Sequence, residues 1–188
     1  MNILIDEEGL LNPNLYSWIA DSAKVPVLLV LIIFSIILMV ALGSIDRPLR
    51  NDLAPKGIIS FELAGSRAKK IVNSWSQAAR QNAFLSLGLD YLYLSVYPLA
   101  LSLACQLAAA TVRGLWLSIG GLISWLVLAA MPLDAFEDYA LIKVLKVPES
   151  ERWPEVAKWC AIPKFGLVFL GLIYLLLWLG LKIAERVM

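Results

Sequence analysis

Four long apolar runs without a single charged residue dominate the pattern of hydrophobic and polar positions along this chain. They cover residues 25–42, 91–110, 114–133 and 165–181. Each approaches the roughly 20 consecutive apolar residues that a helix needs to cross the hydrocarbon core of a bilayer. The pattern therefore predicts an all-α integral membrane protein, a single domain over residues 1–188 whose four transmembrane helices form an antiparallel bundle.

The second and third runs are separated only by Thr111, Val112 and Arg113. So short a connection predicts a tight antiparallel helical hairpin. Pro98 lies inside the second run, and Pro132 lies near the end of the third. Because proline lacks the backbone N–H that a helix interior uses, both positions are expected to kink or interrupt their helices.

The segment between the first and second runs follows a different pattern. Over residues 66–82, Ile71, Trp75 and Ala79 recur at helical spacing on one face, while basic residues occupy much of the rest. This predicts a cytoplasmic amphipathic helix that leads into the second span. Two interpretations stay open: the helix lies on the inner leaflet, or it packs against neighbouring helix ends. In the first interpretation, the residues in contact with lipid are Lys69, Lys70, Trp75 and Arg80.

The basic residues divide unevenly between the two sides of such a bundle. Twelve lie in or beside the two long loops, and four lie near the termini and the hairpin turn. Because loops rich in Lys and Arg stay in the cytoplasm, we expect residues 43–82 and 146–162 there and both termini outside. The acidic residues Asp6, Glu7 and Glu8 agree with an external N-terminus. The expected location is the cell (inner) membrane, with the lipid bilayer as the first partner and a second copy or another membrane protein as candidates for a protein partner.

The composition mainly excludes classes of partner and of chemistry. Apolar residues make up 60% of the chain and charged residues 16%, whereas soluble domains are about half apolar and about a quarter charged. With a net charge of +1 and no nucleic-acid-binding motif, no nucleic-acid partner is expected. The absence of histidine removes the usual acid or base at neutral pH and the commonest metal ligand. No cofactor is indicated, and Cys105 and Cys160 are expected to lie too far apart for a disulfide.

Candidate chemistry lies in acidic residues that flank the second and third runs. Asp90 lies 22 residues before residue 112, the centre of the turn, and Asp134 lies 22 residues after it. At about 1.5 Å of rise per residue, the hairpin brings both acids to the same depth. Glu137 and Asp138 share a helical face with Asp134 through i+3 and i+4 spacing.

Two tyrosines accompany these acids. Tyr93 and Tyr97 follow Asp90 at i+3 and i+7, so a continuous helix would place all three side chains on one face. The sequence therefore predicts an acidic layer at the cytoplasmic mouth of the bundle, which binds an ion or another ligand. Its residues are Asp90, Tyr93, Tyr97, Asp134, Glu137 and Asp138.

This acidic layer has two interpretations. In the structural one, the acids mark the membrane edge and are neutralised by Lys143, Lys146 or Arg80. In the functional one, like charges at one depth require a cation, a basic partner or a shared proton. Acids at a helix end are usually solvated or paired, which slightly favours the structural interpretation, whereas the equal depth of acids on two different helices supports the functional one.

Three stretches carry a resemblance: FELAG at 61–65, LDYLYLSVY at 89–97 and LDAFEDYALIKVL at 133–145. They resemble a pattern in a group of bacterial four-span membrane proteins, whose third span ends in Leu-Asp-x-x-Glu-x-x-x-Leu. The residues that match this arrangement are Leu133, Asp134, Glu137 and Leu141. The resemblance covers roughly residues 58–145, and it implies a four-span membrane fold without implying an activity.

Together these features favour a small non-enzymatic membrane protein: a binding, accessory or assembly subunit whose acidic layer holds a cation or a cationic or lipidic molecule. Two alternatives stay open. The first is a membrane-embedded enzyme that acts on a lipid or isoprenoid through Asp90, Asp134 and Glu137. The second is a subunit of an ion or small-molecule transporter, which must oligomerise because four spans are few for a transport path.

Overall fold

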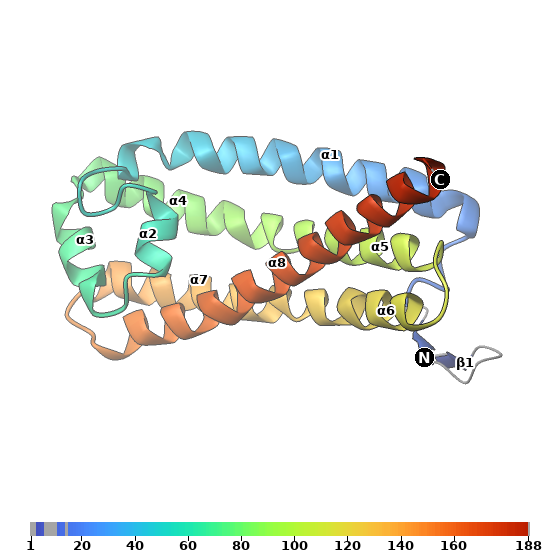
Figure 1. The fold of residues 1–188 in the computed structure, drawn as a ribbon. Coiled ribbons are helices and arrows are strands. Elements are labelled where there is room, and N and C mark those ends of the chain that lie inside the picture. The colour runs from blue at the N-terminus through green and yellow to red at the C-terminus, as the bar shows by residue number, and fades with distance from the viewer. Residues whose placement is uncertain (1–2, 6–10, 14, 188) are drawn as a thin grey trace. The chain divides into compact units, whose positions relative to one another are not determined.

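The computed structural model describes residues 3–5, 11–13 and 15–187 (Figure 1). Its regular structure is helical apart from two short strands, β1 (Ile3–Ile5) and β2 (Leu11–Pro13), which pair antiparallel with Ile3 opposite Pro13. The predicted all-α class is confirmed. The acidic residues at positions 6–8 lie outside the described residues.

Ten helical segments follow the strands in the described chain. They are α1 (Asp21–Ile45), η1 (Arg47–Leu49), α2 (Ile58–Glu62), η2 (Gly65–Arg67), α3 (Ala68–Ser74), α4 (Gln77–Tyr93), α5 (Tyr97–Ala109), α6 (Leu115–Leu128), α7 (Ala130–Lys146) and α8 (Arg152–Val187).

Four stretches of these helices are long and apolar enough to cross a membrane: Asp21–Ile45, Gln77–Ala109, Leu115–Lys146 and Arg152–Val187. They cover the four predicted runs except Ala110 and Gly114 beside the hairpin turn, and polar residues continue each helix past its apolar part. The number of candidate spans is therefore confirmed.

The two prolines explain why the second and third stretches each consist of two helices. Pro98 is the second residue of α5, and Pro132 is the third residue of α7. A proline fits the first turn of a helix, where its missing N–H has no partner to lose. The predicted interruptions thus take the form of new helix starts.

The described chain divides into two compact units, each assembled from stretches far apart in the sequence. The first takes in residues up to 33, residues 97–130 and residues from 166 onward. The second takes in residues 34–96 and 131–165. The prediction of a single membrane domain over the whole chain stays a prediction.

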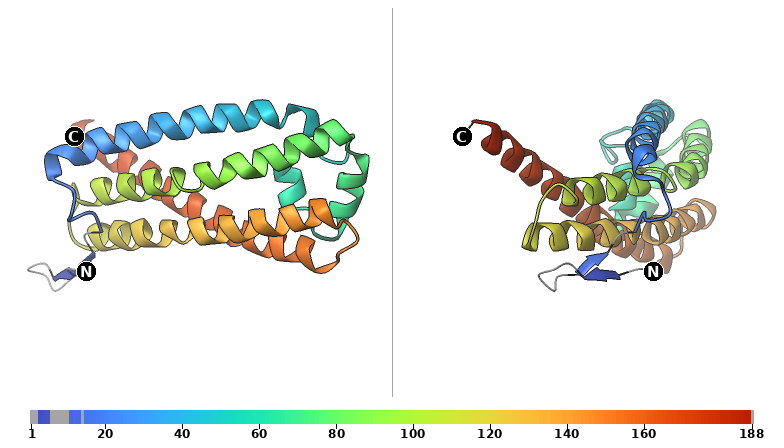
Figure 2. Two further views of the ribbon diagram at one scale, coloured as in Figure 1. Left: turned by 180° about the vertical axis from the view of Figure 1, so that it is seen from behind. Right: turned by 90° about the vertical axis from the view of Figure 1, so that its right-hand side faces the viewer.

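In the first unit, α5 and α6 form the predicted hairpin and lie side by side (Figure 2). Ser102 and Ser124 bind each other's backbone across it: Ser102 Oγ donates to the Ser124 carbonyl at 2.7 Å, and Ser124 Oγ donates to the Ser102 carbonyl at 3.0 Å. The Tyr174 ring of α8 packs against Gly120, where a side chain would collide with it. Gly120 therefore allows the close helix contact expected of glycines in membrane bundles.

In the second unit, the prediction of one continuous amphipathic helix over residues 66–82 is wrong. The segment forms η2 and α3, turns extended at Trp75, and restarts as α4 with Ser76 as the N-cap. Trp75 is only 4% exposed, and its Nε1 donates to the Leu49 carbonyl at 2.8 Å. Lipid contact by this ring is therefore wrong, because the apolar face packs into the core of the unit.

The three basic residues that were predicted to contact lipid differ from Trp75 in exposure. Lys69 and Lys70 are exposed, and Lys69 pairs with Glu149. Arg80 is half-buried, and its Nε donates to the Val72 carbonyl at 3.0 Å. Lipid contact by these three side chains stays a prediction.

Candidate functional site

Five carboxylates converge inside the second unit, and we call them the acidic cluster. One comes from α2, one from α4 and three from α7: Glu62, Asp90, Asp134, Glu137 and Asp138. The three on α7 share a face through i+3 and i+4 spacing. All except the half-buried Asp90 are at most 6% exposed. Charged side chains this deeply buried require partners.

The prediction that the hairpin brings Asp90 and Asp134 side by side is confirmed. Carboxylate oxygens of these two residues and of Asp138 lie within 4.8 Å of one another. Tyr91, next to Asp90, also reaches α7, where its hydroxyl donates to the Ala135 carbonyl at 3.1 Å. Thus α4 and α7 meet with Asp90 beside Asp134, as predicted from their equal distances from the turn.

Lys164 on α8 is the basic partner of one side of the cluster. Its Nζ lies 2.8 Å from Asp134 Oδ1, 2.7 Å from Glu137 Oε2 and 3.8 Å from Glu62 Oε2. The lysine is only 5% exposed, so these contacts form away from water. Removal of one partner from a buried ion pair is strongly destabilising, because it leaves an uncompensated charge.

The structural interpretation of the sequence named the wrong basic residues, since the partner of the acidic cluster is Lys164. Among the described residues, Lys143, Lys146 and Arg80 form no ion pair with the cluster. Lys143 instead lies over the Tyr139 ring, with Nζ 5.1 Å from the ring centroid. The available signal was the position of Lys164 directly before the fourth apolar run, since the acids likewise lie at the ends of apolar runs.

Glu62 is the other site residue that the spacing argument missed, since it lies on a short helix outside the spans. Burial raises the pKa of Glu62, while the nearby Lys164 charge opposes this shift and the Asp134 charge adds to it. Burial and neighbouring carboxylates both favour the protonated form of a carboxyl group, whereas a neighbouring lysine favours the ionised form.

The tyrosines are divided between the two units. Tyr93 lies in the second unit, within electrostatic range of Asp90, Asp134 and Lys164. Tyr97 begins α5 and belongs to the first unit. Because α4 ends at Tyr93, the i+7 spacing from Asp90 to Tyr97 does not run along one helix, and it no longer places Tyr97 on the face of Asp90.

Three of the carboxylates form a group with the composition of a cation site, and we call it the acidic triad: Asp90, Asp134 and Asp138. Asp138 is only 1% exposed, and in the described chain neither of its carboxylate oxygens has a hydrogen-bond partner. An oxygen of this unpartnered carboxylate nevertheless lies within 4.8 Å of oxygens from Asp90 and Asp134. A buried carboxylate aimed at two others requires a proton or a cation.

The triad geometry suits a hard divalent cation. Calcium binds oxygen at about 2.3–2.6 Å, so two ligands on opposite sides of one ion lie about 5 Å apart. The 4.8 Å limit on the triad oxygens falls within that span. Carboxylate-only sites favour Mg²⁺, Ca²⁺ or Mn²⁺ over softer metals, which prefer imidazole or thiolate ligands.

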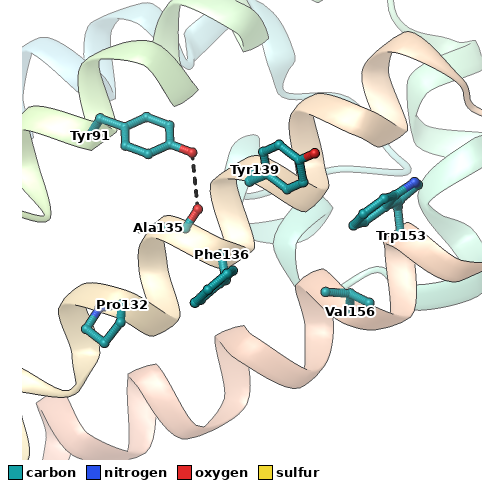
Figure 3. Close-up of a pocket in the computed structure, with 7 residues that line it drawn as sticks. All are labelled: Tyr91, Pro132, Ala135, Phe136, Tyr139, Trp153 and Val156. Carbon is teal, nitrogen blue, oxygen red and sulfur yellow. Dashed lines mark hydrogen bonds between the residues drawn. The ribbon is translucent and has the colours of Figure 1, made fainter.

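An apolar pocket of about 540 Å³ lies on the same helices (Figure 3). Tyr91 contributes from α4, and Trp153 and Val156 contribute from α8. The α7 side is formed by Pro132, Ala135, Phe136 and Tyr139. Its lining contains none of the five carboxylates, although several lining residues directly follow them in the sequence.

No protein-family model, curated protein or solved structure matches this chain.

Proposed function

We propose that this chain is a small multi-pass protein of the cell (inner) membrane that binds a hard divalent cation at the acidic triad. Its role is that of a non-enzymatic binding, accessory or assembly subunit. The observation that carries the proposal is Asp138, whose two buried oxygens lack a hydrogen-bond partner in the described chain while it converges with Asp90 and Asp134.

Charge balance supports a cation over a purely structural cluster. Five carboxylates face one ammonium, that of Lys164, among the described residues of the cluster. Lys164 contacts Asp134, Glu137 and Glu62, which leaves Asp90 and Asp138 without an ion-pair contact to it. With all five carboxylates ionised, Lys164 leaves a formal charge of −4 on the cluster, and a divalent ion at the triad halves it where desolvation makes uncompensated charges costly.

The enzyme alternative has weaker support. Chemistry on a lipid requires a cavity into which the acids open, so that a reacting atom can approach them. The pocket on α4, α7 and α8 is lined by aromatic and aliphatic side chains and by none of the acidic cluster. A site in which the acids face one another suits ion binding better than catalysis on an external substrate.

Calorimetric titration of the full-length chain tests the proposal. The protein is purified in a neutral detergent, stripped with EDTA, dialysed, and titrated separately with Mg²⁺, Ca²⁺ and Mn²⁺. We expect at least one of these ions to bind saturably with one ion per chain. Asp138→Asn should weaken that binding by about tenfold or more, since every 1.4 kcal/mol of lost interaction is a factor of ten.

The matched control is Asp52→Asn, which removes an exposed carboxylate outside the cluster. It should leave the affinity unchanged. The absence of saturable binding by all three ions, or an affinity unaltered by Asp138→Asn, would overturn the proposal.

A further inference from the structure

The apolar pocket beside α7 has a second feature that the cation proposal does not use, which is a pair of basic side chains at one end. Tyr139 and Trp153 meet edge to face there, with ring centroids 5.6 Å apart and planes at 82°. Lys143 Nζ lies 5.1 Å from the Tyr139 centroid, and Arg152 Cζ lies 5.5 Å from the Trp153 centroid. Two cations thus lie over two of the aromatic rings that line the pocket.

Neither cation has a carboxylate partner among the described residues. In the part of the chain that the structure describes, no carboxylate lies within ion-pair distance of Lys143 or Arg152. Arg152 is exposed and Lys143 is half-buried, so both groups can receive a ligand. The contact that the structure shows for each cation is with an aromatic ring, which leaves its charge available to an anion.

The pocket itself offers apolar surface to a chain-like ligand. Phe136 and Tyr139 are 64% and 46% exposed, and Figure 3 shows Phe136 and Pro132 on the side of α7 that faces α8. The Tyr91 hydroxyl is already engaged with the Ala135 carbonyl, so the wall there presents an aromatic ring with its polar group satisfied. A volume of about 540 Å³ is within the range of ordinary ligand pockets.

We infer that this pocket is a binding site for an anionic phospholipid, with one acyl chain in the pocket and the phosphate against Lys143 and Arg152. Charge complementarity identifies the occupant: an apolar groove closed by two unpaired cations matches a lipid whose chain and negative headgroup are joined. Arg binds phosphate through a planar fork, and basic pockets between membrane helices select anionic headgroups. The inference does not depend on the cation site, which uses different side chains.

Native mass spectrometry of the full-length chain tests the lipid site. The delipidated protein in neutral detergent is mixed with phosphatidylglycerol or with phosphatidylcholine of identical acyl chains. We expect the anionic lipid to bind more tightly. Lys143→Gln with Arg152→Gln should reduce this preference by about twenty- to thirtyfold, since each basic residue near a membrane contributes a factor of about five.

Two further variants separate the pocket from general surface charge. Ala135→Phe fills the pocket without changing charge, and it should weaken the binding of both lipids. Lys182→Gln removes a basic residue of α8 that pairs with Glu185, and it should leave the preference intact. Thermal unfolding of each variant identifies any that fails to fold, in which case Val156→Phe, on the α8 wall of the pocket, replaces Ala135→Phe.

Three results would overturn the inference. The first is equal binding of the two lipids by the unaltered protein, as expected of a zwitterionic-lipid or isoprenoid pocket. The second is a preference that survives the double charge variant. The third is lipid binding unaffected by the pocket-filling variant, because the lipid would then lie on the outer surface of the protein.

Discussion

Lys164 is the residue on which the buried charges of the second unit depend most. Its Nζ lies within 2.8 Å of two carboxylates and 3.8 Å from a third, and all four side chains are buried. Loss of this ammonium leaves three buried carboxylates without their basic partner. Lys164→Met keeps the apolar length of the side chain, so its effect isolates the charge.

We expect Lys164→Met to lower the free energy of unfolding by about 3–5 kcal/mol, the usual cost of removing one partner from a buried ion pair. Denaturant unfolding in detergent measures it. The control is Lys182→Met, which breaks a partly exposed pair with Glu185 and should cost less than about 1 kcal/mol. Equal effects of the two substitutions would contradict this account of Lys164.

Asp46 gives the chain a defined pH dependence. It is only 9% exposed and accepts a hydrogen bond from Ser86 Oγ at 2.7 Å. Burial raises its pKa, while the Ser86 hydrogen bond and the Arg50 charge oppose the shift. The folded protein therefore keeps a proton on Asp46 at pH values where the unfolded chain has already released it.

Linkage fixes the sign of the effect. Because the folded state binds more protons, the contribution of Asp46 to the free energy of unfolding falls as pH rises from the ordinary aspartate pKa of about 3.9 through the raised pKa. Asp46→Asn should flatten this decline, as measured by thermal unfolding across that range. Asp52→Asn, at an exposed position, should leave the slope unchanged, and a slope equally unchanged in Asp46→Asn would contradict the prediction.

At the scale of elements, the contact between α6 and α8 depends on the absence of a side chain at Gly120. A Cβ there would lie 2.1 Å from Tyr174 Oη and 2.7 Å from Ala109 Cβ. Gly120→Ala should destabilise the protein by about 1–3 kcal/mol, the typical cost of overpacking. Gly180→Ala is the control, because no atom lies within 4 Å of a Cβ at that position.

The contact between Gly120 and Tyr174 can also be tested by a change at Tyr174. Tyr174→Phe removes the hydroxyl that lies closest to the new methyl group, so it should restore part of the stability that Gly120→Ala loses. Thermal unfolding of the two single variants and the double variant gives the coupling. Strict additivity of the two losses would show that Gly120 does not act through Tyr174.

Sequence patterns predicted the elements unevenly, for physical reasons. The spans were found because an uncharged run near 20 residues has few alternatives to crossing a bilayer. The break at Trp75 was missed, although the residues around it have helical spacing. There the indole N–H bonds the Leu49 carbonyl, and Ser76 caps the next helix by accepting a hydrogen bond from the Ala79 N–H at 3.2 Å. The Trp75 contact joins residues 26 apart and leaves no periodic signal, whereas the Ser76 cap is local and a serine at that position was the available signal.

At the scale of the whole molecule, part of the site followed from topology alone. Asp90 and Asp134 meet because a tight hairpin equalises their distances from its turn, which needs only counting. Lys164 and Glu62 were missed as partners because they lie on α8 and α2, whose register relative to the hairpin no turn fixes. Sequence spacing locates partners across a short connection, whereas partners on separate elements depend on packing.

Orientation is a prediction about the whole chain in its membrane. Twelve basic residues lie in or beside the two long loops, against four on the opposite side, so we expect residues 43–82 in the cytoplasm and both termini outside. Reporter fusions at residue 188 and within 147–151 measure this in cells. Activity at residue 188 of a reporter that works only in the cytoplasm would contradict the predicted orientation.

The proposed cation site joins Asp90, Asp134 and Asp138. Anomalous diffraction at the manganese edge, from crystals of the full-length chain soaked in Mn²⁺, locates a bound ion. We expect an anomalous peak bonded to a carboxylate oxygen of each of these residues at about 2.0–2.6 Å, the range covered by Mg²⁺ and Ca²⁺. Ordered triad carboxylates with no peak between them, or with Lys164 Nζ in that position, would contradict it.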